Sequence, residues 1–317
     1  MGDKLLSVTP CNVQSRLVPV SIGNFDSFTF LRPVESNSFC LATELPSMSD
    51  RSLLLTEADL ARTYDGGVYA DAVEVVEQYH EVMRYRSKHP DKGSLAIATR
   101  FDLPRGRVRP WVDRVSKPDP VRAIDAARRN GWIDVGYQDK TFSSLNALVA
   151  NVFSGGSVAE EGFQPSFALN RSGSNDRLFD ALEAANVSYQ VVDERERRAD
   201  EVRPTENGTV LGRVLSALGA PVGPKARQRL GLPGYLDDAP SEIRETFVRC
   251  YLENRASERE GRKALTFRED RNVSYLHELA ALIEDISDGS VNVNGKNVYV
   301  TSEAAANLER TTLSSRG

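Results

Sequence analysis

The chain has few of the residues that build metal centres or disulfide frameworks. Its 317 residues include only three cysteines and three histidines. Cys11, Cys40 and Cys250 show no paired spacing and the histidines are scattered, which excludes a zinc signature and a disulfide scaffold. We therefore expect an intracellular fold without a metal or other cofactor, in which Cys250 is a small buried hydrophobic residue.

Long apolar runs are also missing. No stretch approaches the roughly 20 residues that a membrane span requires, and the N-terminus lacks a basic region followed by an apolar core. Hydrophobic residues make up 40% of the chain and charged residues 27%, which is ordinary for a globular protein with two or three domains. The expected location is the cytoplasm, and the sequence identifies neither a membrane contact nor a small-molecule ligand.

Composition and pattern divide the chain into four regions, and the predicted fold class is α+β. Residues 1–50 carry few charges and are either a poorly ordered natural extension or a leader upstream of an alternative start at Met48. Residues 51–135 are expected to form an all-α domain, residues 141–303 a second module, and residues 304–317 a C-terminal tail.

Residues 94–114 are the most informative segment. They combine an apolar helix, a short turn and a second, arginine-rich helix, which is the pattern of a helix-turn-helix. Ala98 is small where the two helices must cross, and Val108 and Trp111 fall three apart on the inner face of the second helix. Asp102 occupies the turn, where it is expected to adopt a left-handed backbone.

Two prolines and a glycine bear on the helix boundaries. Pro104 is expected to open the second helix, and Pro110, inside it, to cause a kink or a late start at a cost of roughly 3 kcal/mol. Gly131 is expected to end a following helix. The other helices predicted for this domain cover residues 56–60, 69–87 and 119–130.

Positive charge is concentrated in this domain. Between Arg84 and Gly131 there are 13 basic and 5 acidic residues, a net charge of +8 in a chain whose total is −5. Such a segment suits contact with the phosphates of DNA. We expect Arg105, Arg107 and Arg109 to reach base edges. The expected phosphate contacts are Lys92, Arg100, Arg114 and Lys117.

The second module repeats one order of elements, which predicts an internal pseudo-dimer. The first half is expected to hold helices and strands at 145–158, 163–169, 176–185, 187–192 and 210–218. The second half repeats the order at 243–257, 264–267 and 275–286, and ends in a hairpin at 291–300. Asn294 and Gly295 are expected to supply the positive φ angles of the hairpin's two-residue turn.

This order resembles the LAGLIDADG homing endonucleases over roughly residues 141–303. Leu148–Ser157 resembles the first signature helix, with Ala150 at a small crossing position and Gly156-Ser157 as its corner. Val248–Ser257 resembles the second, with Cys250 at the matching position and Ala256-Ser257 as its corner. The resemblance implies a pseudo-dimeric αββαββα domain whose sheets bind DNA. WhiA-type regulators are similar in pairing such a module with a helix-turn-helix, in the opposite order.

The residues that would carry catalysis in that family are absent. Gly155 and Arg255 stand where the resemblance places the two metal-binding carboxylates, and neither can hold the divalent ions that activate water. Glu253 lies two residues from position 255, about 200° away around the helix, and is a poor substitute. The resemblance therefore implies a non-catalytic domain, and Mg²⁺ is expected only if the chain is a nuclease.

Basic residues in the second module are candidate contacts for a DNA-binding sheet surface, which we call the saddle. They are Arg171, Arg195, Lys225, Arg227, Arg229, Arg262, Lys263 and Arg268. Acidic neighbours such as Glu194, Glu258 and Asp270 dilute this charge, which leaves dimerisation or partner docking as an alternative role for the module.

The favoured function is sequence-specific binding of double-stranded DNA by a nucleoid-associated transcriptional regulator that is not an enzyme. One alternative is an active LAGLIDADG homing endonuclease or nickase with unorthodox ligands. Another is a replication or plasmid-maintenance factor. A homodimer, the DNA target and the sign of regulation are left open by the sequence.

Overall fold

The computed structural model describes residues 53–69, 71–171, 173–193, 200–258 and 263–314. The chain divides into two units, Met1–Ser47 and Met48–Gly317, and every described residue lies in the second. The predicted N-terminal extension and two saddle candidates, Arg195 and Arg262, lie outside the described residues.

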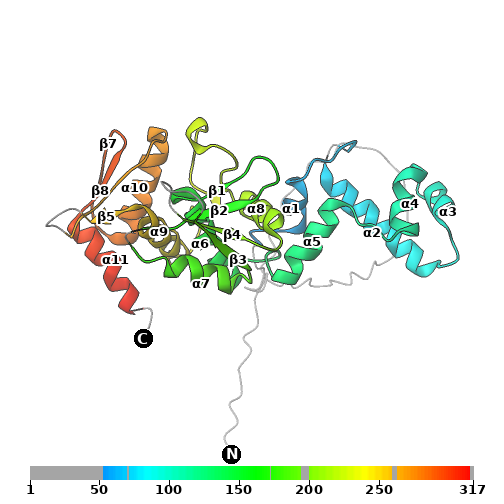
Figure 1. Cartoon of the computed structure of the whole chain (residues 1–317), viewed down its shortest axis with the longest axis horizontal. Coiled ribbons are helices and arrows are strands. Elements are labelled where there is room, and N and C mark those ends of the chain that lie inside the picture. The colour runs from blue at the N-terminus through cyan, green and yellow to red at the C-terminus, as the bar shows by residue number, and fades with distance from the viewer. Residues whose placement is uncertain (1–52, 70, 172, 194–199, 259–262, 315–317) are drawn as a thin grey trace, which may run out of the picture. The chain divides into compact units, whose positions relative to one another are not determined.

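The described residues before position 140 form a helical domain (Figure 1). Its helices are α1 (Glu57–Arg62), α2 (Ala72–Lys88), α3 (Ser94–Arg100), α4 (Arg105–Asp113) and α5 (Asp119–Asn130). Thr56 and Asp59 form a capping box at the start of α1. Gly131 ends α5 in the left-handed conformation, and Asp102 adopts a φ of +51° between α3 and α4, as predicted.

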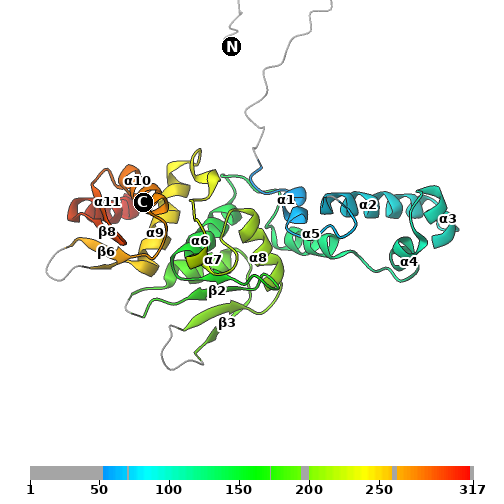
Figure 2. The same ribbon diagram turned by 90° about the horizontal axis from the view of Figure 1, so that it is seen from above.

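One apolar core joins these helices. Tyr79 and Val82 of α2, Ile97 of α3 and Trp111 of α4 are all buried in it, and the rings of Tyr79 and Trp111 pack edge to face with centroids 5.6 Å apart. Helix α2 therefore supports the pair α3 and α4, which lies at the far end of α2 from α1 in both Figure 1 and Figure 2.

Helix α4 opens at Pro104, as predicted, and differs from the prediction at Pro110. Pro104 is the N-cap residue, and the helix begins at Arg105 and continues through Pro110, so of the two predicted outcomes, a kink or a late start, the late start is wrong. Proline at 110 removes one hydrogen bond to the carbonyl of Gly106. Gly106 is exposed in the first turn of the helix, where water can satisfy that carbonyl, and the helix forms without the bond.

Val115 follows α4 in a conformation that normally favours glycine. Its φ is +54° and the residue is 66% exposed, while Ser116 N–H donates to the Pro110 carbonyl at 3.0 Å. A left-handed backbone costs a residue with a Cβ about 1–2 kcal/mol, and the exposed valine gains little packing in return.

We expect Val115→Gly to raise the free energy of unfolding by about 1 kcal/mol, because the relief of backbone strain exceeds the entropy that glycine adds to the unfolded chain. Urea unfolding measures this. Arg114→Gly is the control, since Arg114 has a φ of −111° and gains nothing from glycine, so it is expected to lower stability. A loss of stability in the Val115 variant would contradict the assignment of strain.

The second module consists of two αββαββα halves. The first contains α6 (Lys140–Ser154), β1 (Ser157–Val158), β2 (Pro165–Ala168), α7 (Asp176–Ala184), β3 (Tyr189–Val192), β4 (Glu201–Pro204) and α8 (Gly208–Ala217). The second contains α9 (Ser241–Arg255), β5 (Ser257–Glu258), β6 (Leu265–Arg268), α10 (Val273–Ser287), β7 (Val291–Asn294), β8 (Asn297–Val300) and α11 (Ser302–Ser314). Short 3₁₀ turns, η1 (Lys225–Arg227) and η2 (Gly234–Leu236), lie between them.

The two halves have the same sheet topology. The strand orders are β1-β2-β4-β3 and β5-β6-β8-β7, and every neighbouring pair is antiparallel. The predicted α+β fold class and the internal pseudo-dimer are therefore confirmed. In the part of the chain that the structure describes, no helix has the length and apolar character needed to cross a membrane.

Two local predictions in the second half are wrong. The segment from residue 304, predicted as a tail, belongs to α11, where Ala304 and Leu308 are buried. In the hairpin, Asn294 pairs with Asn297, so the turn residues are Gly295 and Lys296, and of these only Gly295 has a positive φ, +58°. A glycine at the first turn position is the requirement of a type II′ turn.

Helices α6 and α9 pack against each other at the pseudo-dyad. The predicted crossing residues Ala150 and Cys250 are both buried. Asn146 of α6 crosses the interface: its Nδ2 donates to the Ile243 carbonyl at 2.8 Å, and its Oδ1 accepts from the Tyr235 hydroxyl at 2.7 Å. A buried amide with both ends bonded fixes the relative position of two otherwise apolar helices.

Candidate DNA-binding site

The helix-turn-helix presents one face of α4 to solvent. Val108, Trp111 and Val112 are buried against α2 and α3, so the opposite face points outward. Ser94 at the start of α3 donates to Asp113 Oδ2 at the end of α4, at 2.9 Å. Together, the buried face and this hydrogen bond hold α4 in one orientation.

The three arginines predicted to read bases differ in their surroundings. Arg105 and Arg109 are exposed, and Arg109 lies 3.8 Å from the carboxylate of Asp113 at the water-exposed surface. Arg107 is half-buried, and its guanidinium carbon lies 4.4 Å from the centroid of the Tyr69 ring. The structure thus places two of the three directly on the outward face of α4 and the third against the loop between α1 and α2.

All four predicted phosphate contacts are exposed. Hydrogen bonds that their ammonium groups donate to carboxylates raise the pKa of two of them: Lys92 beside Asp91 at 3.1 Å, and Lys117 beside Asp125 at 2.5 Å. Both remain charged at neutral pH, but each carries its own counter-charge. Within the described residues no carboxylate pairs with Arg100 or Arg114, so these two have the more available positive charge.

Gly155, the first predicted degenerate catalytic position, lies beside Asn254 near the end of α9. A Cβ added at Gly155 would collide with Oδ1 of Asn254, and that side chain donates from Nδ2 to the Ala168 carbonyl at 2.7 Å. An uncharged amide therefore fills the place that a carboxylate at 155 would need. Among the described residues no group of three or more histidine, cysteine, aspartate or glutamate side chains is arranged to hold a metal ion.

Glu253 is occupied in an ion pair. Its carboxylate lies 2.7 Å from Arg177 Nε of α7, and burial raises its pKa while Arg177 opposes the rise. The side chain is thus directed to a structural partner in the opposite half, which agrees with the expectation that it does not replace an acid at 255.

Arg255 is the centre of a cluster that the sequence did not predict. Its Nε donates to Glu269 Oε1 at 2.6 Å, and its Nη2 donates to the Arg268 carbonyl at 2.9 Å. Glu269 is 1% exposed, accepts a second hydrogen bond from the Tyr251 hydroxyl at 3.0 Å, and lies 3.7 Å from Arg271. The arginine at the dyad is therefore partly neutralised by a buried carboxylate of its own half.

Lys225, a predicted saddle contact, is directed into the protein. Its ammonium donates to the carbonyls of Val152 and Phe153 at 2.5 and 3.1 Å, near the C-terminal end of α6. Burial lowers the pKa of Lys225 to about 8, assisted by the positive charges of Arg271 and Arg255. The lysine caps a helix C-terminus and is unavailable to the surface. Of the other saddle candidates, the structure shows these exposed: Arg171, Arg227, Arg229, Lys263 and Arg268.

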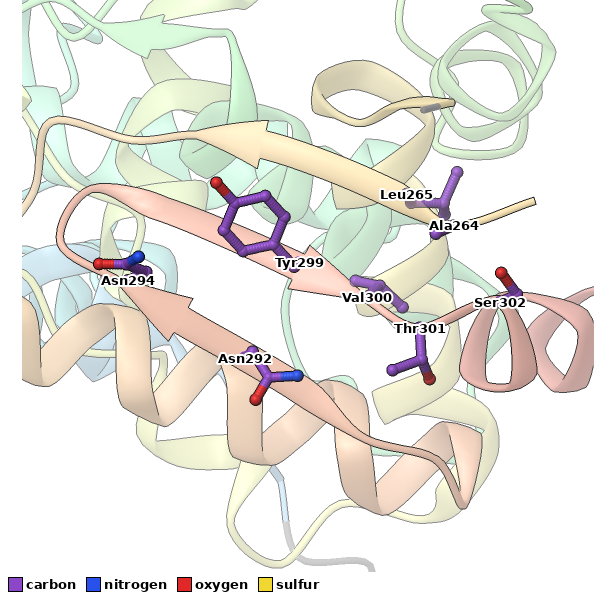
Figure 3. A pocket seen from close by; sticks show the side chains of 8 residues that line it. All are labelled: Ala264, Leu265, Asn292, Asn294, Tyr299, Val300, Thr301 and Ser302. Atoms are coloured by element: carbon purple, nitrogen blue, oxygen red, sulfur yellow. The ribbon is translucent and has the colours of Figure 1, made fainter. Parts of the chain in front are cut away.

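The outer face of the second sheet carries an uncharged polar set that sequence reasoning missed. Residues paired across β6, β8 and β7 share a face of the sheet. The uncharged polar residues on the outward face are Thr266, Asn292, Asn294, Asn297 and Tyr299, and Arg268 lies on the same face. A hollow of about 500 Å³ lies along these strands, and Figure 3 shows Asn292, Asn294 and Tyr299 at it. The alternation of polar and apolar residues in 291–300 was the available signal.

The corresponding face of the first sheet is chemically different. There Glu201 accepts a hydrogen bond from Ser166 Oγ at 2.8 Å and pairs with Arg203 at 2.7 Å. On this face of the first sheet, charged and hydroxyl groups bond to one another. The outward face of the second sheet carries mainly amide and hydroxyl groups. The two halves of the pseudo-dimer therefore present unequal surfaces.

No protein-family model and no curated protein sequence matches the chain. Among solved structures it is similar to full-length DUF199/WhiA from Thermatoga maritima, with 10% identity and a TM-score of 0.37 over 59% of this chain and 65% of that one. It is also similar to the N-terminal LAGLIDADG domain of DUF199/WhiA, with 10% identity and a TM-score of 0.38 over 57% of this chain and 87% of that one. A third match is I-DmoI in complex with DNA and Mn, with 10% identity and a TM-score of 0.36 over 56% of this chain and 98% of that one. The αββαββα architecture of the chain is established independently by its own strand order and pairing.

Proposed function

We propose that the protein binds double-stranded DNA in a sequence-specific manner, regulates transcription at the nucleoid, and does not cut its target. The observation that carries this proposal is the outward face of α4, where exposed Arg105 and Arg109 stand on a helix held by a buried core and a hydrogen bond to α3. Arginine pairs bidentately with the major-groove edge of guanine, and a net charge of +8 across this segment supplies attraction to phosphates.

The second sheet supports a further contact with the same DNA. Asparagine amides pair with adenine edges and hydroxyl groups with either kind of base, and the outer face of β6, β8 and β7 presents both kinds of group. Arg268 at the end of β6 and Lys263 before it are exposed beside this face and suited to backbone phosphates. In this proposal the second module adds contacts, while α4 reads the central bases.

Selection from a library of duplexes with a randomised core tests sequence-specific binding. We expect the full chain to enrich a defined site, and Arg105→Ala and Arg109→Ala each to weaken binding to it by about 1–3 kcal/mol with little loss on random duplex. Arg122→Ala is the matched control, because Arg122 is exposed on α5 of the same domain. No enriched site, or equal losses on both kinds of DNA, would contradict the proposal.

Incubation of supercoiled plasmid carrying the selected site with Mg²⁺ or Mn²⁺ tests the nuclease alternative. We expect no nicking, because Gly155 and Arg255 supply no carboxylate at the dyad and Asn254 fills the space beside Gly155. Cleavage that disappears in a Glu253→Gln variant would overturn the non-catalytic part of the proposal and leave the DNA-binding part intact.

A further inference from the structure

The loop between α1 and α2 reaches α4 through a single aromatic contact. Arg107 lies with its guanidinium carbon 4.4 Å from the centroid of the Tyr69 ring, within the range of a cation–π interaction. The Tyr69 hydroxyl in turn donates to Gln78 Oε1 of α2 at 2.6 Å. The ring is therefore fixed at its far end by the same helix that supports α3 and α4.

This contact uses only part of the hydrogen-bonding capacity of the guanidinium, which also donates to the Tyr69 hydroxyl oxygen. An arginine side chain has five N–H donors in the plane of its guanidinium group, and stacking on an aromatic ring uses the face of that plane. The donors point out along its edges, where a bidentate pair with guanine O6 and N7 forms. One N–H of Arg107 bonds to the Tyr69 hydroxyl oxygen, and the remaining donors suffice for a bidentate pair with a base.

Stacking also limits the positions that Arg107 can adopt. A long arginine side chain loses rotamer freedom when it binds, and a group already held in its bound orientation loses less. Neither Arg105 nor Arg109 has such a contact among the described residues; Arg109 has only an exposed carboxylate at 3.8 Å. The three arginines of α4 therefore differ in preorganisation.

We propose that Tyr69 is a positioning residue that orients Arg107 to read a guanine in the DNA target. The inference rests on the proposed function and deepens it, because it assigns a guanine-reading role to the arginine that is half-buried in the free protein. It also places the loop before α2 beside the DNA, where Val68 is 83% exposed. Tyr69 itself acts through Arg107 and reads no base.

A double-mutant cycle on the selected duplex tests this role. We expect Tyr69→Leu to weaken binding to that duplex by about five- to tenfold and Arg107→Ala by about ten- to hundredfold, each with less than about a twofold effect on random duplex. On the Arg107→Ala background, Tyr69→Leu is expected to have no further effect. Tyr69→Phe is the matched control, since it keeps the ring and loses the hydroxyl with its bonds to Gln78 and Arg107.

Replacing single guanines of the selected site by 7-deazaguanine, which lacks the N7 acceptor, gives a second readout. One guanine is expected to lose affinity on this change with the unmodified protein and to lose none with the Arg107→Ala variant. At that same position the loss is expected to be smaller with Tyr69→Leu than with the unmodified protein. Thermal unfolding checks that each variant is folded. If Tyr69→Leu does not fold, a second double-mutant cycle uses Tyr69→Phe and Arg107→Lys instead.

Three other results would separate a failure of this inference from a failure of the proposed function. If the chain selects a duplex and the penalty of Tyr69→Leu is the same with and without Arg107, Tyr69 serves only the fold and the inference is wrong. If Arg107→Ala binds the selected duplex as well as the unmodified protein while Arg105→Ala does not, the inference is wrong and the proposed function stands. If no duplex is selected, the proposed function itself has failed.

Discussion

Replacing Glu269 with alanine is expected to lower the free energy of unfolding by about 3–5 kcal/mol, the usual cost of breaking a buried ion pair. The carboxylate is 1% exposed and accepts hydrogen bonds from Arg255 at 2.6 Å and Tyr251 at 3.0 Å. Its removal leaves the guanidinium groups of Arg255 and Arg271 beside the buried ammonium of Lys225 with no negative charge among them. Urea unfolding at neutral pH measures the loss.

The neighbouring residue provides a matched control. Asp270 is exposed and pairs with Lys296 at the surface, so Asp270→Ala removes a carboxylate one position along the chain with little expected effect. Glu269→Gln keeps hydrogen-bonding capacity and loses the charge, and is expected to fall between the two. Equal stability of the Glu269 and Asp270 alanine variants would show that the cluster contributes nothing to folding.

This cluster explains what occupies the centre of the second module. Arg255 at the dyad, Arg271 after β6 and Lys225 between the halves are held around one carboxylate and the carbonyl groups that end α6. A divalent ion in this place would meet three positive side chains, which oppose its binding electrostatically. In this cluster the positive charges are balanced by the buried Glu269 carboxylate and by backbone carbonyl groups.

Much of the fold could be predicted because it is encoded locally. The periodicity of apolar residues predicted α5 with its boundaries, and the small, turn-forming and apolar positions of residues 94–114 predicted α3 and α4. The repeat of element order predicted the two halves of the second module. Three of the described strands were missed. Strands β1 and β5 have two residues each and exist through their pairing with β2 or β6, and β4, with four residues, is held by its pairing with β2 and β3. Such pairing has no local signal.

The site could be predicted only in part, because its distinctions depend on distant contacts. Three arginines at alternate positions look equivalent in the sequence, and a tyrosine from another loop makes Arg107 different. Lys225 follows a glycine- and proline-rich turn and looks like a surface residue, yet it caps α6. A side chain whose partner lies far away in the sequence produces no recognisable pattern in the residues around it.

Replacing Arg213 with alanine is expected to lower the free energy of unfolding by about 3 kcal/mol, because this side chain of α8 makes three contacts at the junction of the two modules, which the bond from Trp132 to the Ala185 carbonyl also spans. Its guanidinium carbon lies 3.7 Å from the Tyr64 ring centroid and 4.0 Å from that of Phe163, and it donates to the Thr63 carbonyl. A desolvated cation–π contact contributes about 1–2 kcal/mol and a charged hydrogen bond about 1.5–3 kcal/mol, part of which solvation recovers.

The two tryptophans allow the consequence for each module to be observed. Trp111 is buried in the core of the helical domain, and Trp132 donates from Nε1 to the Ala185 carbonyl of the second module at 2.7 Å. Fluorescence therefore follows the helical domain and its junction, while far-UV circular dichroism follows both modules. We expect coincident urea transitions in the unmodified protein and, in Arg213→Ala, a fluorescence transition at lower urea than the dichroism transition. Arg122→Ala, an exposed arginine of α5, is expected to leave the transitions coincident.

A separation of the transitions has a direct consequence for DNA binding. The helix-turn-helix and the second sheet can engage one duplex together at little entropic cost only if the junction fixes their relative position. We therefore expect Arg213→Ala to weaken binding to the selected duplex without touching any base. If the variant unfolds in two steps but binds that duplex as tightly as the unmodified protein, the second module does not share the DNA with α4.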